Sequence, residues 1–347
     1  MTCARLLQPL AAALLLVSFV ASPARGDDDR PTYDSFYVFG DSLADTGNVW
    51  LSTGGPSPSA PPPSGSYFQG RFSNGPVAFE YLWQRLSGAR PGSAGALQPA
   101  ISGRPGPAVN FAFGGTGSGV TSFTPGNFEA PGLLGQVGMF GGMLAGRRPS
   151  PNALYAIVTG ANDYTSPTGL RPEDVVANIA AAVSQLDGLG AGDIIVLTMP
   201  NLGCLPYGTP GQCLEPAQAG VPAPGQLPTP SQLTALHNML LTQTLSQLPL
   251  VNARVKVIDV NVVFSLLRRV TVWKSAALDF LVPPVNPAAP TSACLFINPA
   301  TCPILTTFSL PRLPAPQFLF WDIVHPTTGA HRVLGEYLYF QLRRSTN

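Results

Sequence analysis

The sequence predicts an α/β fold in which a central parallel sheet is flanked by helices. Two observations favour this fold. Short apolar runs of strand length alternate with longer segments of helical periodicity, which is typical of parallel sheets with crossover helices. In addition, 45% of the 347 residues are hydrophobic and only 11% are charged, so the chain can bury a sizeable core.

The predicted elements follow one another in a regular order. The strands are 35–39 (SFYVF), 108–113 (AVNFAF), 154–160 (LYAIVTG), 193–200 (DIIVLTMP) and 254–260 (RVKVIDV). Helical patterns lie between them: 75–86 carries a proline at its start, 171–192 has early acids and late glycines, and 229–248 is periodic. Another helical pattern, TTGAHRVLGEYLYFQL, lies near the C-terminal end.

Two segments rich in Pro, Gly and Ser, 52–66 and 214–230, interrupt this order. We interpret them as surface excursions and not as linkers, so residues 27–347 are expected to form a single domain. The Gly-rich stretch 114–119 (GGTGSG) has no Lys-Ser/Thr close behind it, which argues against a phosphate-binding loop.

The N-terminal residues 1–26 have the pattern of a signal peptide. Arg5 precedes an apolar stretch that reaches Val20, and the small residues Ala24 and Gly26 follow it. The alternative is a membrane anchor, but the uninterrupted apolar stretch is shorter than the ~20 residues that a spanning helix needs. We therefore expect a secreted protein, extracellular or periplasmic, without a permanent membrane anchor.

The charge pattern excludes one large class of partner. The net charge is +1, and only two lysines, Lys256 and Lys274, accompany the scattered arginines. No basic stripe suited to a phosphate backbone is visible, so nucleic acid is not an expected partner. Nothing in the pattern indicates an oligomeric state.

The four cysteines beyond the predicted signal peptide form two local pairs, which suits an oxidising compartment. Three connectivities are possible, and we favour Cys204 with Cys213 and Cys294 with Cys302, because each pair closes a short loop. A zinc site is the alternative, but the C-x-x-C spacings and neighbouring histidines that would support it are missing.

Ser42 is the first candidate for chemistry, because it directly follows a predicted strand. A serine hydroxyl needs an adjacent base and usually a carboxylate that orients this base. Of the three histidines, His237 and His331 lie within helical patterns. His325 precedes a proline, which favours a fixed loop, and Asp322 lies three residues before it. One turn could join Asp322 to His325; the alternative is a helix-capping Asp beside a surface His.

An ester hydrolase also needs donors aimed at the oxyanion. The backbone N–H of Ser42, a backbone N–H at Gly115 and the carboxamide of Asn162 all follow predicted strands, so they could share one crevice at the carboxyl edge of the sheet. A turn glycine and an Asx turn are the alternatives for Gly115 and Asn162.

Together these residues resemble the four ordered motif blocks of the GDSL, or SGNH, hydrolases. The blocks are GDSL with its continuation ADTGN (40–48), NFAFGGTG (110–117), GAND (160–163) and DxxH (322–325). The segments GRFSNGPVAFEYL (70–82), MPNLGCLP (199–206) and LFWDIVHPTTGAH (319–331) look like the lipase and lecithinase-type branch. Ala44 replaces the serine that is usual in the family.

The resemblance implies a three-layer α/β/α sandwich and an ester hydrolase without metal or organic cofactor. It assigns Ser42 as nucleophile, His325 as base and Asp322 as its orienting acid, with oxyanion donors at Ser42, Gly115 and Asn162; Gly114 is the alternative to Gly115.

The implied substrate is an acyl ester or lipid. Acyl transfer or phospholipase activity through the same acyl-enzyme is the main alternative, and an inactive secreted binding protein is another. Four aromatic residues line an acyl groove or fill the core, and we favour the core for most: Phe68, Phe72, Phe140 and Phe264.

Overall fold

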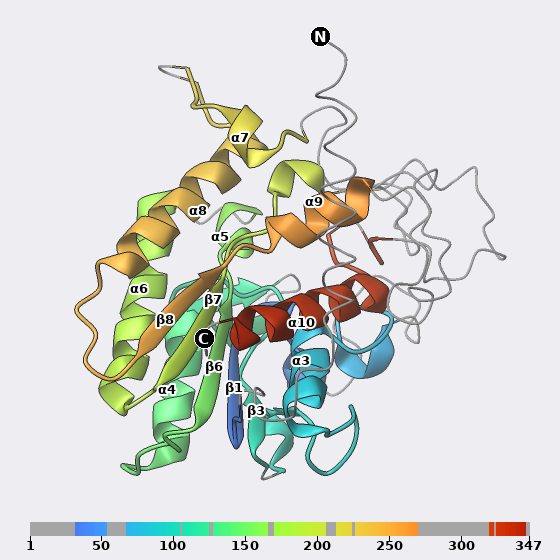
Figure 1. Ribbon diagram of the computed structural model, residues 1–347, viewed down its shortest axis with the longest axis vertical. Coiled ribbons are helices and arrows are strands. Elements are labelled where there is room, and N and C mark those ends of the chain that lie inside the picture. The colour runs from blue at the N-terminus through green and yellow to red at the C-terminus, as the bar shows by residue number, and fades with distance from the viewer. Residues whose placement is uncertain are drawn as a thin grey trace, which may run out of the picture.

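The computed structural model describes residues 32–53, 67–104, 106–124, 128–165, 170–205, 213–223, 226–269, 319–322 and 324–344. The predicted signal peptide (1–26) and the cysteines Cys294 and Cys302 lie outside these residues. Figure 1 shows the described elements as a sheet covered by helices on both faces.

The main sheet has six strands in the order β2-β3-β1-β6-β7-β8. All neighbouring strands run parallel, as the alternation of strands and helices predicts. The strands are β1 (Ser35–Gly40), β2 (Gln98–Pro99), β3 (Ala108–Asn110), β6 (Ala153–Val158), β7 (Asp193–Leu197) and β8 (Arg254–Ile258). A separate antiparallel hairpin joins β4 (Thr121–Thr124) and β5 (Phe128–Pro131).

The helices form two outer layers, so the predicted α/β/α sandwich is confirmed (Figure 1). One layer contains α4 (Leu133–Leu144), α6 (Pro172–Leu189) and α8 (Pro230–Ser246). The other contains α3 (Ala78–Ser87), α9 (Asn261–Arg269) and α10 (Thr328–Arg343). Short helices complete the described elements: α2 (Asn48–Ser52), α5 (Ala161–Thr165), α7 (Pro216–Ala219), η2 (Phe68–Gly70), η3 (Ala100–Ser102) and η4 (Leu202–Cys204).

Two hydrophobic cores lie on opposite faces of the sheet, because successive side chains of a strand point in opposite directions. On β1, Phe36 and Val38 belong to the core under α3, α9 and α10, whereas Phe39 belongs to the core under α4, α6 and α8. On β6 all six residues are buried. This burial on both faces explains why the central strands β6 and β7 are continuous apolar runs, whereas the edge strand β8 alternates in Arg254–Val257 and is only partly buried.

Several elements differ from the sequence-based expectation. The strands at 108–113 and 193–200 end early, at Asn110 and Leu197, because the residues that follow form loops at the sheet edge. Helix α4 was not predicted, since its four glycines lower the helix propensity. Packing outweighs this propensity: Leu133, Val137 and Phe140 are fully buried against the sheet.

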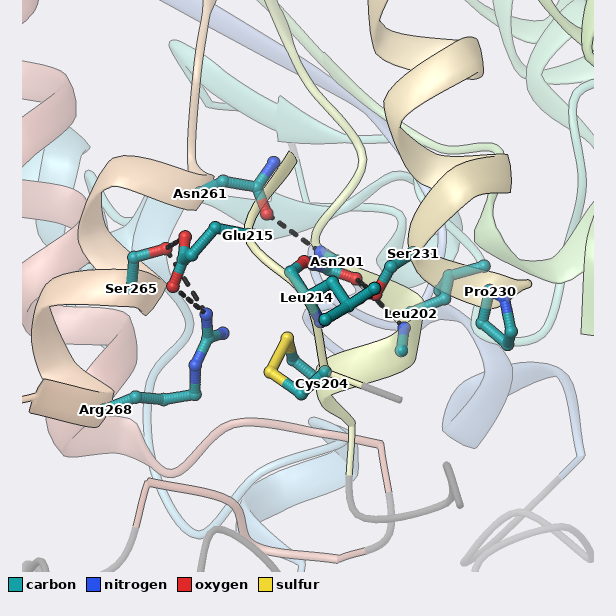
Figure 2. The surroundings of a disulfide bond; sticks show 12 residues. Asn201, Leu202, Cys204, Leu214, Glu215, Pro230, Ser231, Asn261, Ser265 and Arg268 are labelled. Atoms are coloured by element: carbon teal, nitrogen blue, oxygen red, sulfur yellow. Dashed lines mark hydrogen bonds and ion pairs between the residues drawn. A yellow bond between two sulfur atoms is a disulfide. The ribbon is translucent and has the colours of Figure 1, made fainter. Parts of the chain in front are cut away.

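The structure contains the predicted disulfide between Cys204 and Cys213. Figure 2 shows how Glu215, just beyond it, is anchored: its carboxylate accepts hydrogen bonds from Ser265 (2.7 Å) and Arg268 (3.2 Å) of α9. The disulfide therefore ties the segment around Glu215 to η4, and Glu215 ties it to α9. In the described part of the chain, no helix is long and apolar enough to cross a membrane.

We expect the double substitution Cys204→Ser, Cys213→Ser to lower the free energy of unfolding by about 2–3 kcal/mol, because the disulfide closes a short loop that otherwise gains conformational entropy on unfolding. Denaturant titration of the oxidised protein measures this difference. A midpoint equal to that of the wild-type chain would show that the disulfide does not stabilise the fold.

Candidate active site

Ser42 lies immediately beyond the carboxyl end of β1, where the chain turns sharply. Gly40 has a φ of +150°, and a Cβ at this position would overlap the carbonyl oxygen of Val158 on β6, so only glycine fits. The buried side chain of Gln136 holds Gly40 on both sides: its oxygen accepts the Gly40 N–H (2.7 Å) and its amide donates to the Gly40 carbonyl (2.9 Å). These bonds hold the backbone at Gly40, two residues before Ser42, and thereby fix the position of Ser42.

His325 reaches Ser42 from the other end of the chain. Asp322 and His325 lie in a tight loop closed by the Phe320–Pro326 bridge and by the Trp321 N–H, which donates to the His325 carbonyl (2.7 Å). The Nε2 atom of His325 is 2.7 Å from Ser42 Oγ, and its Nδ1 atom is 2.6 Å from Asp322 Oδ2. The structure therefore brings the three predicted residues into one continuous line of hydrogen bonds.

The charge of Asp322 decides which ring nitrogen of His325 carries the proton. Burial alone raises the pKa of Asp322, but His325 and the backbone N–H groups of Val324 and His325 outweigh it and hold this pKa below its ordinary value. An ionised carboxylate only accepts hydrogen bonds. The proton of the neutral imidazole therefore lies on Nδ1, and the Nε2 lone pair faces the Ser42 hydroxyl.

Gly115 and Asn162 line the same cavity as Ser42. Asn162 comes from α5, directly after β6, and its Nδ2 donates to the Thr116 carbonyl (2.9 Å), which leaves the second hydrogen of this amide for another acceptor. The N–H of Gly114 donates to Asp45 Oδ2 (2.9 Å), away from this role. Of the two neighbouring glycines, the geometry therefore favours Gly115 as the donor.

A buried polar network that the sequence pattern did not reveal joins the first two motif blocks. The Asp45 carboxylate accepts backbone N–H groups of Gly47, Asn48 and Val49 in addition to that of Gly114. Asn48 donates to the carbonyls of Asn110 and Ala112 across the loop. The only signal in the sequence is the polar run ADTGN, whose residue types suggest an exposed loop and not this buried one.

The cavity beside Ser42 has a volume of about 280 Å³ and a largely apolar wall. The nonpolar side chains that line it are Leu43, Phe72, Ala161, Pro200, Leu202, Leu205, Phe264, Phe320, Val324 and Pro326. Of the four aromatic residues considered above, Phe72 and Phe264 lie in this wall, while Phe140 is fully buried in the core. Phe68 is half-buried beneath the guanidinium of Arg71. The expectation that most of the four fill the core is confirmed, because Phe72, Phe140 and Phe264 are all buried in the hydrophobic clusters. Phe72 and Phe264 also present part of their surface to the cavity.

The other two histidines lie in helices, as predicted, and do not line the cavity. Burial lowers the pKa of His237 to about 4 and that of His331 to about 3, so both are neutral at physiological pH. His237 bonds to the Tyr164 hydroxyl (2.8 Å), and His331 accepts the Ala78 N–H (3.3 Å). Within the described ranges, no cluster of three or more His, Cys, Asp or Glu side chains is arranged to hold a metal ion.

Comparison with known proteins identifies a family model and several relatives. The model of GDSL-like lipases and acylhydrolases matches residues 36–338. A phosphatidylcholine-sterol acyltransferase of Aeromonas hydrophila is 28% identical, over 92% of this chain and 93% of that protein. A GDSL esterase/lipase of Arabidopsis thaliana is 29% identical, over 97% and 98% of the two chains. Among solved structures, a carbohydrate acetylesterase of Sinorhizobium meliloti matches 90% of this chain and 99% of its own, with a TM-score of 0.44 and 12% identity.

Asp41 is a buried carboxyl group that also lines the cavity. Burial raises its pKa to about 7, although the Leu43 N–H, which it accepts at 3.0 Å, opposes this shift. A carboxyl whose pKa is higher in the folded than in the unfolded chain stabilises the fold in its protonated form. This contribution is complete below the unfolded pKa and is lost as the pH rises through about 7.

We therefore expect the wild-type protein to gain about 2–3 kcal/mol more stability than an Asp41→Asn variant when the pH falls from about 8 to about 5. The asparagine keeps the shape of the side chain but does not titrate. Denaturant titration of both proteins at the two pH values measures the difference. Equal gains in both proteins would contradict the raised pKa of Asp41.

Proposed function

The chain belongs to the family of GDSL-like lipases and acylhydrolases, and from this premise we propose that it is a secreted carboxylic ester hydrolase that works through a serine acyl-enzyme. The observation that carries this proposal is the line of two short hydrogen bonds from Ser42 through His325 to Asp322. This geometry activates a serine hydroxyl without a metal ion, because the base and the group that orients it are already in contact.

In the proposed reaction, Ser42 Oγ attacks the carbonyl carbon of the ester while His325 Nε2 takes the hydroxyl proton. Asp322 stabilises the imidazolium that forms. The N–H groups of Ser42 and Gly115 and the side-chain amide of Asn162 donate to the oxyanion. When the tetrahedral intermediate collapses, His325 gives its proton to the leaving alcohol, and the acyl group remains on Ser42.

Water then completes the cycle. His325 removes a proton from a water molecule that attacks the acyl carbon, and it returns this proton to Ser42 Oγ as the acid is released. The apolar wall of the cavity suits the hydrocarbon part of an acyl ester or lipid, because desolvating both surfaces is favourable. Secretion is supported by the N-terminal pattern and by the disulfide, which is typical of an oxidising compartment.

Acyl transfer is a second candidate function, favoured by the similarity to the Aeromonas hydrophila acyltransferase. In this reaction an acceptor hydroxyl, in place of water, attacks the same acyl-enzyme, so the residues and their roles do not change. Phospholipase activity, with a phospholipid as the acyl donor, would use the same acyl-enzyme. An inactive binding protein is less consistent with the site, since every proposed catalytic position carries the required residue type.

We expect Ser42→Ala and His325→Ala each to lower the hydrolysis of a p-nitrophenyl ester by roughly 10³-fold or more while the fold stays intact. The assay runs from acetate to palmitate esters, and Ser52→Ala is the matched control, because Ser52 is an exposed serine at the end of α2. Wild-type labelling of Ser42 by a fluorophosphonate probe checks the nucleophile directly. Substantial hydrolysis by either alanine variant would overturn the assignment.

The choice between hydrolysis and transfer is tested with an acceptor alcohol. If water is the natural acceptor, adding a sterol or sugar alcohol leaves the yield of free acid unchanged. If the protein is a transferase, a new ester forms at the expense of free acid, and both products disappear in the Ser42→Ala variant. Chromatographic analysis of the products distinguishes these outcomes.

A further inference from the structure

Tyr67 donates a hydrogen bond to Asp322, the carboxylate proposed to orient His325. The Tyr67 hydroxyl is 2.8 Å from Asp322 Oδ2, the same oxygen that lies 2.6 Å from His325 Nδ1. The other oxygen, Oδ1, accepts the N–H groups of Val324 and His325. Tyr67 is thus the one described side chain, besides His325 itself, that bonds to this carboxylate.

The backbone around Tyr67 is held in place by a buried ion pair. Arg71 and Glu80 contact each other at 2.7 Å with both side chains largely buried, and Arg71 also donates to the Gln69 carbonyl (2.8 Å). The ring of Tyr67 meets the ring of Trp321 edge to face, at 6.3 Å between centroids. These contacts direct the Tyr67 hydroxyl at Asp322.

The segment that follows Tyr67 also packs against the loop of Asp322 and His325, but at other points. The Phe72 ring lies 5.2 Å from the His325 ring, Ser73 Oγ donates to the Pro326 carbonyl (2.9 Å), and Asn74 Oδ1 accepts the Thr328 N–H (2.8 Å). None of these bonds reaches the carboxylate. The contribution of Tyr67 can therefore be separated from the general packing of this segment.

We propose that Tyr67 is a positioning residue that orients Asp322 and, through it, sets the pH range in which His325 acts as a base. The inference rests on the proposed function of Ser42, Asp322 and His325. A donor on Oδ2 draws electron density away from the Asp322–His325 bond and so weakens the stabilisation of the imidazolium. Without this donor, the carboxylate would hold the protonated ring of His325 more strongly.

The Tyr67 hydroxyl remains a donor throughout the working range, because burial and the Asp322 carboxylate raise the pKa of Tyr67. Electrostatic interactions couple His325 to three further titratable groups of the described chain: Asp322, Asp41 and His331. Burial lowers the pKa of His331 to about 3, so it stays neutral. Burial raises the pKa of Asp41 to about 7, so this carboxyl changes charge in the pH range where histidines ordinarily titrate. The test therefore compares only proteins that retain Asp41.

The test compares Tyr67→Phe with the wild-type protein and with Tyr81→Phe. Phenylalanine keeps the ring of Tyr67 in the cavity wall and removes only the hydroxyl. Tyr81→Phe is the matched control, because the Tyr81 hydroxyl bonds to Thr328 Oγ1 (2.8 Å) on the same side of the site but does not contact the carboxylate. Two pH profiles are measured for each protein: kcat/KM for p-nitrophenyl acetate, and the rate at which a fluorophosphonate labels Ser42.

In Tyr67→Phe we expect the acidic limb of both profiles to move to higher pH by about half a unit to one unit. We also expect kcat to fall roughly 3- to 10-fold at an unchanged KM, because the orientation of Asp322 is less well fixed. Tyr81→Phe is expected to keep the wild-type limb, and thermal unfolding shows whether each variant is folded.

Three results would overturn the proposal, and they are distinguishable. Labelling of Ser42 with the same pH profile in wild type and Tyr67→Phe refutes the role of Tyr67 alone and leaves the proposed function intact. An equal shift in Tyr81→Phe also refutes it, because the effect then comes from packing and not from the bond to Asp322. The absence of labelling at Ser42 in the wild-type protein refutes the proposed function and this inference together.

Discussion

The arrangement of the whole site depends on one steric constraint, the close approach of Gly40 to the carbonyl oxygen of Val158. Because no Cβ fits there, β1 ends against β6 and the chain turns at once into Asp41 and Ser42. Gln136 of α4 then bonds to both backbone groups of Gly40: it accepts the buried N–H, and it shares the carbonyl oxygen with the N–H of Phe113 and the hydroxyl of Thr116. A helix that the sequence pattern failed to predict therefore fixes the backbone that carries the proposed nucleophile.

The parallel sheet converts this local constraint into a site. The carboxyl ends of β1, β3 and β6 meet at one edge, and Ser42, Gly115 and Asn162 follow these three strands. Buried hydrogen bonds then join the loops to each other, above all those of Asp45 and Asn48. These hydrogen bonds, together with the small apolar cluster of Val49, Phe72, Phe113 and Ala130, hold the loops against each other.

Much of this arrangement could be predicted from the sequence, because strand runs and short polar motifs are local patterns. The parallel sheet, the helices α3, α6, α8 and α10 and the Cys204–Cys213 pair follow from such patterns, whereas α4 and α9 do not. Tyr67 could not be found in this way, since it lies 255 positions from Asp322 and has no motif of its own. That Phe72 and Phe264 line the cavity while they are also buried in the core could not be predicted for a similar reason: an aromatic residue has the same local signature in a core and in a pocket.

The distance along the chain between Ser42 and His325 has a consequence for synthesis. The two residues bond to each other across 283 positions. A ribosome makes the N-terminal part first, so Ser42 emerges long before the loop that holds the proposed base. Under the proposed mechanism, the growing chain has no base for the Ser42 hydroxyl until that loop is complete. Activation of the proposed nucleophile therefore comes only after most of the chain has been made.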